Sequence, residues 1–280
     1  MSASALTDLH LHSDHSDGRL TPAALVALAA AQGVRHLALT DHDTVAGLDH
    51  AAAACAAAGL RFTPGVEATA LWRGQSIHVI GLGLQPDEPV LSAHLAGLRQ
   101  HRRQRLLAIG ERLARRARLP DAPAIAARIG AETAVPTRTH LARALVEAGA
   151  ATDLANAFRR LLGHGGPGHL PEDWPALEAT VAVLRGAGAQ VVLAHPHRYR
   201  LSGGALRALT GEFAAHGGHA LEVSLGNMAR ADLDRLAALA RRHGLAASCG
   251  SDFHDPAMPW NTPGRFAKLP TDLEPVSGRL

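Results

Sequence analysis

The sequence predicts an α/β fold in which seven strands form a barrel that is interrupted by a helical insertion. Three observations lead to this prediction. The chain has 280 residues, which at about 150 residues per domain is roughly two domains, or one barrel-sized domain with an insertion. Apolar residues make up 47% of the chain, enough to bury a sizeable core. Short apolar runs alternate with helical patterns, as they do in parallel sheets and barrels.

The alternating elements can be placed along the chain. The expected strands are Leu6–His12, His36–Thr40, Arg61–Glu67, Ile77–Leu82, Gln190–His195, Ala220–Val223 and Ala246–Gly250. The expected helices between them run from Thr21 to about Gln32 and over Val45–Ala58, Leu177–Arg185, Leu206–His216 and Leu233–His243. Thr21 before Pro22 is a typical helix start, and Gly33 and Gly59 follow the ends of the first two helices. Seven strands favour a barrel.

The middle of the chain breaks this alternation. We expect residues 99–169 to form a helical cap or substrate subdomain, inserted between barrel segments at residues 1–98 and 170–280. Apolar residues recur there with the three- and four-residue spacing of one face of a long helix. They are Leu91, Leu95, Leu98, Leu106, Ile109 and Leu113. Arg102 falls on the same stripe, where its guanidinium needs a partner or faces a site.

Charge and cysteine content narrow the function classes. Lysine plus arginine exceeds aspartate plus glutamate by 28 − 25 = 3, and Lys268 is the single lysine, so arginine, which suits bidentate phosphate contacts, carries the positive charge. Two cysteines, Cys55 and Cys249, exclude a disulfide framework and a cysteine-rich zinc module. We see no secretory signal pattern and no apolar run of membrane-span length. The expectation is a cytoplasmic enzyme or binding protein with no membrane role and no obligate protein partner.

Histidines and carboxylates gather at the ends of the predicted strands. The candidates are His10, His12, Asp17, His42, Glu67, His78, His195, Asp252 and His254. In a β/α barrel the strand ends converge on one face, where active sites are built. Nine groups are too many for one metal ion of four to six ligands, so the economical interpretation is a centre of two or three ions.

Each of these residues alone is weak support for a metal site. A lone histidine at a strand end is more often a hydrogen-bonding residue, and only the combination indicates metal ligation. Cys249, close to Asp252, is a nucleophile by residue type. We expect it instead to be a small residue of the barrel wall.

Five short motifs resemble those of the PHP (polymerase and histidinol phosphatase) superfamily. They are Asp8-Leu9-His10-Leu11-His12-Ser13, Thr40-Asp41-His42-Asp43, Gly65-Val66-Glu67, Ala194-His195-Pro196 and Ser251-Asp252-Phe253-His254. The resemblance covers about Leu6–Leu98 and Pro171–Phe253. The insertion is similar to that of the 3′,5′-nucleoside bisphosphate phosphatases, which are related to the exoribonuclease RNase AM. The supporting segments are Arg138-Thr139-His140, Phe158–Leu162 with Gly166-Pro167-Gly168, and His195–Tyr199.

The resemblance implies a distorted, TIM-like barrel of seven strands that holds three metal ions, usually Mn²⁺. Carried over residue by residue, one ion would take His10, His12, Glu67 and Asp252. A second would share Glu67 and take His78 and His195, and a third would take Asp17, His42 and His254. A nitrogen and oxygen ligand set without thiolate suits Mn, Fe or Zn. The ligand set does not exclude Zn²⁺, Fe²⁺ or Mg²⁺ in place of Mn²⁺.

The resemblance also implies a reaction, the removal of the 3′-phosphate from nucleoside 3′,5′-bisphosphates. The nucleophile would be a metal-activated hydroxide held by Glu67, His195 and Asp252, because metal binding lowers the pKa of water from about 15.7 to about 7. A bisphosphate substrate also needs a second anion site. The expected substrate-binding residues are Arg102, Arg105, Arg138, His140 and Arg198.

Three alternative functions remain open from the sequence. The same site would serve a 5′-to-3′ exoribonuclease on short or 5′-phosphorylated RNA, although the few aromatic residues speak against a stacking platform. Histidinol phosphate hydrolysis is a second alternative, against which the helical insertion favours a nucleotide. A non-catalytic metal-binding module is the third, and the complete set of nine ligand-type residues argues against it.

Overall fold

The computed structural model describes residues 6–280, which fall into two compact units. The first unit combines the residues up to Leu95 with Trp174–Leu280, and the second is Ala96–Asp173. The long helix α3 (Pro89–Ala117) begins in the first unit and continues into the second. The sequence-based segments 1–98, 99–169 and 170–280 differ from this division by a few residues.

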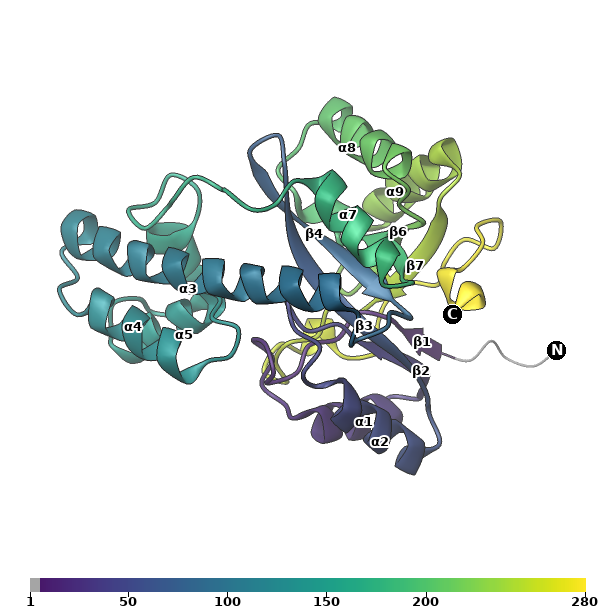
Figure 1. The fold of residues 1–280 in the computed structure, drawn as a ribbon, viewed down its shortest axis with the longest axis horizontal. Helices are drawn as coiled ribbons and strands as arrows, with labels where there is room; N and C mark the ends of the chain where they lie inside the picture. Colours follow the sequence, from purple (N-terminus) through teal and green to yellow (C-terminus); the bar gives the residue numbers. More distant parts are fainter. Residues whose placement is uncertain (1–5) are drawn as a thin grey trace. The chain divides into compact units, whose positions relative to one another are not determined.

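The first unit contains a sheet of seven strands in the order of the chain (Figure 1). The strands are β1 (Leu6–Asp8), β2 (Val34–Leu39), β3 (Arg61–Trp72), β4 (Gln75–Leu82), β5 (Gln190–Leu193), β6 (Ala220–Leu225) and β7 (Ala246–Gly250). The segments that follow β1 and β7 are joined as a barrel requires. Leu9 N–H donates to Cys249 O over 3.1 Å, and Asp252 N–H donates to His10 O over 2.9 Å. The predicted seven-stranded α/β fold is confirmed.

The sheet is mostly parallel, with one strand reversed. β4 pairs antiparallel with both β3 and β5. A two-residue turn joins β3 to β4, and its residues Arg73 and Gly74 have φ angles of 47° and 80°, as a tight hairpin turn requires. Because β4 runs in reverse, its beginning lies at the edge of the sheet where its neighbours end.

The strand ends also differ from the predicted ones. β1 stops at Asp8 instead of His12, because beyond it Leu9 and His12 donate their N–H groups to Cys249 and Phe253 rather than to β2. β3 extends to Trp72, five residues past the predicted Glu67, because the hairpin gives it a full-length partner. β7 has the predicted bounds.

Five longer helices accompany the sheet. They are α1 (Pro22–Ala31), α2 (Leu48–Ala58), α7 (Leu177–Gly186), α8 (Gly203–Ala215) and α9 (Arg230–His243). α1 and α2 pack together beside β2 and β3 (Figure 1). α7 packs against β3, β4 and β5, α9 packs against β6 and β7, and α8 packs against α7 and α9. The Thr21 side chain caps α1 by accepting from Ala24 N–H, and Pro22 begins the helix, as the sequence predicts.

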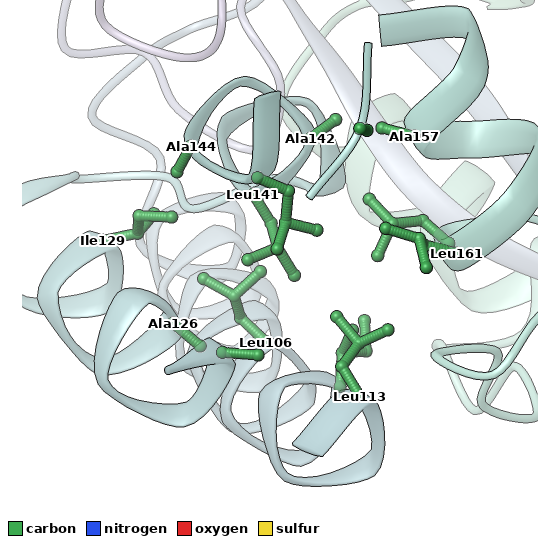
Figure 2. Close-up of a cluster of buried hydrophobic side chains, with 14 residues drawn as sticks. Leu106, Leu113, Ala126, Ile129, Leu141, Ala142, Ala144, Ala157 and Leu161 are labelled. Carbon is green, nitrogen blue, oxygen red and sulfur yellow. The ribbon is translucent and has the colours of Figure 1, made fainter. Parts of the chain in front are cut away.

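The second unit is helical over the residues described. Beyond α3 it contains α4 (Ala122–Glu132), α5 (Arg138–Glu147), α6 (Leu154–Ala157) and the π-helical turn η1 (Phe158–Leu162). Figure 2 shows its core, in which Leu106 and Leu113 of α3 face Ile129, Leu141 and Leu161. The predicted leucine and isoleucine stripe is buried along the whole of α3.

The tail after His254 contains short regular elements. It forms the 3₁₀ turns η3 (Pro259–Asn261) and η4 (Val276–Arg279), and it adds a parallel bridge between Ala247 and Pro275. Val276 is fully buried in the barrel core. Among residues 6–280, no helix combines the length and apolar character needed to cross a membrane.

Candidate metal centre

The nine predicted ligands come together at one edge of the barrel. His10 and His12 follow β1, His42 follows β2, His195 follows β5, and Asp252 and His254 follow β7. Glu67 lies within β3. His78 lies near the beginning of the reversed strand β4, which places it at the same edge.

Glu67 is the centre of the cluster. Its Oε1 lies 2.8 Å from His195 Nε2 and 3.0 Å from His78 Nδ1. Its Oε2 lies 2.9 Å from His42 Nδ1, 3.3 Å from His12 Nε2 and 3.4 Å from His10 Nε2. One fully buried carboxylate therefore faces five imidazoles.

Asp252 and Asp17 complete the arrangement. Asp252 Oδ1 lies 3.2 Å from His10 Nε2 and 3.3 Å from His12 Nε2. Asp17 Oδ1 lies 3.2 Å from His254 Nε2 and 3.8 Å from His42 Nε2. The His12 and His254 rings stack with their centroids 4.0 Å apart, so the two carboxylates are linked through these rings.

Among the described residues, three groups have donor atoms close enough to hold a common ion. They are His10, His12 and Glu67; then His42, Glu67 and His78; and then His12, Asp17, His42 and His254. Each group contains at least two members of one of the sets that the resemblance implies, and Glu67 again belongs to two groups. The groups differ from those sets in two ways: His12 and His42 each belong to two groups, and Asp252 and His195 belong to none.

The backbone is strained where it presents these side chains. His195 and Asp252 have φ angles of 30° and 52°, which residues other than glycine adopt at a cost of about 1–3 kcal/mol. Gly250 allows a close approach, since a Cβ there would lie 2.3 Å from His10 Cβ. Strained conformations of this kind cluster at functional sites.

Charge in the cluster favours ionised carboxylates, and it divides the imidazoles into two kinds. Desolvation alone would lower the pKa of His10 and His12, but Asp252, Glu67 and, for His10, Glu222 raise the pKa of His12 to about 9 and that of His10 well above its usual value. Burial alone would raise the pKa of Glu67, but His42, His78 and His10 bring it well below its usual value. Asp17 behaves in the same way beside His254 and His42. Desolvation lowers the pKa of His42 to about 4, despite the neighbouring carboxylates. Desolvation likewise lowers the pKa of His195.

These donor atoms fit divalent cations. His42 Nδ1 and Glu67 Oε2 are 2.9 Å apart, yet neither makes a hydrogen bond with any residue from 6 to 280. Two buried polar atoms this close are unfavourable unless a proton or a metal cation lies between or beside them, and a divalent cation would fill that role. Imidazole nitrogen with carboxylate oxygen is a ligand set that suits Mn, Fe and Zn.

The cluster is open to solvent on one side. Side-chain exposure is 25% for His78 and 21% for His254, whereas His10, His12 and Glu67 are fully buried. A substrate would therefore reach the cluster beside His78 and His254.

Several buried groups that support the cluster were missed in the sequence. Asp41 accepts hydrogen bonds from the Ser13 and Ser16 hydroxyls, each over 2.6 Å, and so shapes the loop that carries Asp17. The Tyr199 hydroxyl accepts from His78 N–H over 2.8 Å and donates to Ala194 O over 3.0 Å. Neither role has a local sequence signal.

Glu222 was also missed, although it has a sequence signal. It is a single carboxylate in the apolar run Ala220-Leu221-Glu222-Val223 and is fully buried in β6. The predicted strand Ala220–Val223 is the one that carries no candidate ligand within it or shortly after it.

The five expected substrate-binding residues have different surroundings. Arg198 forms an ion pair with Asp252 beside the cluster. In the helical unit, Arg105 donates to Pro171 O over 2.7 Å and to Glu172 Oε2 over 3.1 Å, and it also pairs with Asp173. The Arg105 guanidinium is therefore already bonded to the segment Pro171–Asp173 at the end of the helical unit.

Arg138 begins α5 with 47% of its side chain exposed, 3.9 Å from Glu172 Oε1. Desolvation, with the nearby charges of Arg102 and Arg105, lowers the pKa of Arg138 against the pull of Glu172. The three guanidinium groups therefore lie in one region of the helical unit. His140 Nδ1 accepts from Thr137 N–H over 3.2 Å in a capping box.

Cys249 is placed as a residue of the barrel wall. Its thiol donates to Thr7 O over 3.6 Å, and burial raises its pKa well above the usual value. A thiol held in the neutral form is a poor nucleophile, which agrees with the structural interpretation of this cysteine.

The sequence matches the PHP domain family over residues 8–156. The 5′-3′ exoribonuclease Rnm of Escherichia coli strain K12 is 42% identical over 271 residues, which cover 96% of this chain and 92% of the relative. A 3′,5′-nucleoside bisphosphate phosphatase of Chromobacterium violaceum is 40% identical, covering 96% of this chain and 94% of the relative.

Solved structures show the same fold. An amidohydrolase from Chromobacterium violaceum, with sulfate bound and no metal, has a TM-score of 0.91 and 40% identity over 98% of this chain and 95% of that one. A candidate metal-dependent phosphoesterase from Bifidobacterium adolescentis has a TM-score of 0.78 and 32% identity over 97% of this chain and 93% of that one.

Proposed function

Because the chain belongs to the PHP domain family, we propose that it is a metal-dependent phosphoesterase that removes the 3′-phosphate of nucleoside 3′,5′-bisphosphates. The products are a nucleoside 5′-monophosphate and inorganic phosphate. The observation that carries this proposal is the buried Glu67 carboxylate that faces five histidines at the barrel edge. Two relatives of similar length are named as a 5′-3′ exoribonuclease and a 3′,5′-nucleoside bisphosphate phosphatase.

We propose that the nine residues hold three ions, with Mn²⁺ the expected metal and Glu67 shared between two of them. Divalent cations in such a site lower the pKa of water from about 15.7 to about 7 and neutralise charge on phosphoryl oxygens. Several side chains of the protein are already oriented or protonated as metal binding requires. Arg198 fixes one oxygen of Asp252 and leaves the other facing His10 and His12. Neutral His42 and His195 keep their lone pairs.

The helical unit supplies the second anion contact in this proposal. Arg102 and Arg138 are the residues we assign to the 5′-phosphate of the substrate, because guanidinium groups bind phosphate in a bidentate manner. Arg105 takes a supporting role, since it is already bonded to Pro171 and Glu172. His140 fixes the start of α5, on which Arg138 lies.

A substrate panel on manganese-loaded protein tests the function. The panel compares adenosine 3′,5′-bisphosphate with 5′-AMP, 3′-AMP, a short 5′-phosphorylated RNA and histidinol phosphate. We expect phosphate release from the bisphosphate with 5′-AMP as the other product, and no release from 5′-AMP itself. Preferential hydrolysis of histidinol phosphate would refute the proposal.

Replacing Arg138 by alanine tests the second phosphate contact. We expect Arg138→Ala to raise KM for adenosine 3′,5′-bisphosphate roughly 10- to 100-fold, since a hydrogen bond to a charged group contributes about 1.5–3 kcal/mol. KM for 3′-AMP, which lacks the 5′-phosphate, should change little. Arg128→Ala is the control, because Arg128 is an exposed residue of α4 that pairs with Glu132. Equal losses on both substrates would contradict this role.

An exposed tryptophan provides a surface for the base. Trp260 is 52% exposed, whereas Trp72 and Trp174 are buried, and its neighbour Asn261 donates to Asp252 O over 3.3 Å. Stacking of a base on an aromatic ring contributes about 1–3 kcal/mol. Trp260→Ala should therefore raise KM for the nucleoside bisphosphate about 5- to 100-fold, while Trp260→Phe keeps most of the affinity. An abasic ribose 3,5-bisphosphate should not distinguish the variants, and equal effects on both substrates would exclude stacking.

A second candidate function is 5′-to-3′ exoribonuclease activity at the same site. The relative named as exoribonuclease Rnm favours it, with 42% identity along nearly the whole chain. The 5′-phosphorylated RNA in the panel separates the two functions. Release of mononucleotides from its 5′ end would establish this activity.

A further inference from the structure

Glu222 stands outside the nine predicted ligands but contacts two of them. Its Oε1 lies 2.9 Å from His10 Nδ1, and its Oε2 accepts a hydrogen bond from His195 N–H over 2.6 Å. Glu222 is fully buried. The pairing of β6 with β7 shifts register between Glu222 and Ser224, an irregularity of the kind that re-aims side chains beside active sites.

The first contact fixes the protonation of His10. An ionised carboxylate only accepts hydrogen bonds, so His10 Nδ1 must carry the proton that it donates to Glu222. The other ring nitrogen, Nε2, is the atom that lies 3.2 Å from Asp252 Oδ1 and 3.4 Å from Glu67 Oε2. Glu222 therefore leaves Nε2 of His10 as the ligating atom.

The second contact holds the His195 backbone. His195 has a φ angle of 30°, a left-handed conformation that must be stabilised by its surroundings. The bond from its N–H to Glu222 lies at this turn. The same turn directs the His195 ring to Glu67, with Nε2 2.8 Å from Oε1. Two candidate ligands from different strands thus depend on one carboxylate.

We infer that Glu222 is a positioning residue that sets the tautomer of His10 and the backbone turn of His195, and thereby the metal affinity of the whole cluster. This inference rests on the proposed metal centre. Hydrogen-bond partners of metal-ligating histidines typically change metal affinity 10- to 100-fold when they are replaced.

Glu222→Gln is the most selective test, because it keeps the shape of the side chain. The amide has one accepting oxygen and one donating NH₂ group. His195 N–H can only donate and so takes the amide oxygen. The NH₂ group then faces His10 Nδ1, which must become an acceptor, so that any ring proton moves to Nε2 and blocks ligation. We expect a 10- to 100-fold increase in the Kd for Mn²⁺, measured by titration calorimetry.

Nitrogen-15 NMR of the histidine rings in metal-free protein gives a second readout. The spectrum is recorded at a pH high enough for the His10 ring to be neutral, because, against desolvation, Glu222, Asp252 and Glu67 raise the pKa of His10 above its usual value. We expect a proton on His10 Nδ1 in the unsubstituted protein and its loss in Glu222→Gln. Thr210→Val is the control, because Thr210 is a buried polar residue of α8 that bonds to Leu206 O. It should change neither Kd nor the His10 signal, whereas a role of Glu222 in folding alone would leave both readouts unchanged in Glu222→Gln.

The outcomes are distinguishable. A folded Glu222→Gln protein with unchanged Kd for Mn²⁺ and a retained proton on His10 Nδ1 overturns the inference. If Glu222→Gln does not fold, the spectrum of the unsubstituted protein decides, because a His10 ring without a proton on Nδ1 overturns it equally. If the unsubstituted protein binds no metal, the proposed metal centre fails, while the NMR comparison still reports whether Glu222 sets the tautomer.

Discussion

Chelation of divalent cations is expected to abolish phosphate release by this protein, with a loss of more than about a thousandfold. The cations are what would lower the pKa of the attacking water and neutralise most of the charge on the phosphoryl oxygens. Cys249, a neutral thiol in the barrel wall, does not replace them as a nucleophile. The measurement is phosphate release from adenosine 3′,5′-bisphosphate after dialysis against EDTA. Adding Mn²⁺ back should restore activity.

The same treatment should lower thermal stability. A ligand present at 100 times its Kd stabilises the folded state by about 2.7 kcal/mol, which for a chain of this size is a shift of roughly 5 °C or more in Tm. Scanning fluorimetry with and without Mn²⁺ measures this shift. Full turnover by metal-stripped protein, confirmed by elemental analysis, would contradict the proposed function.

Replacing Glu67 by glutamine is expected to have an effect of similar size. The carboxylate faces His10, His12, His42 and His78 as well as His195, and in our proposal it is shared by two ions. The amide removes its charge and one of its two accepting oxygens. We expect Glu67→Gln to lower kcat/KM more than about a thousandfold and to reduce the number of Mn²⁺ ions bound per chain.

A matched control separates this effect from a general loss of charge. Glu132→Gln changes an exposed carboxylate of α4 that pairs with Arg128, and it should retain both activity and metal content. Circular dichroism checks that each variant is folded. A Glu67→Gln protein with its full metal content and activity would exclude the central role of this carboxylate.

The sequence predicted the edge of the barrel well because the relevant information is local. A ligand such as His42 or His195 follows an apolar run, and parallel strands bring their ends to a common edge. His78 lies at the same edge for a reason that could not be predicted from the sequence. The Arg73-Gly74 turn reverses β4, and that reversal brings the beginning of the strand to the site.

The contacts that could not be predicted join residues far apart in the chain. Glu222 and His10 are separated by 212 positions, and only the closed order of the strands makes them neighbours. The partners of Arg105 in the segment Pro171–Asp173 lie 66 to 68 positions away. The residue type of Arg105 therefore suggested a phosphate contact, whereas its ion pairs could not be predicted from the sequence. Hydrophobic periodicity locates elements, but it does not specify which polar groups will meet.

Anomalous X-ray diffraction from crystals grown with Mn²⁺ tests the account most directly. We expect more than one manganese peak within coordination distance of the cluster, with Glu67 Oε1 and Oε2 bound to different ions and His10 bound through Nε2. Ordered, active protein with no manganese peak beside Glu67 would contradict it.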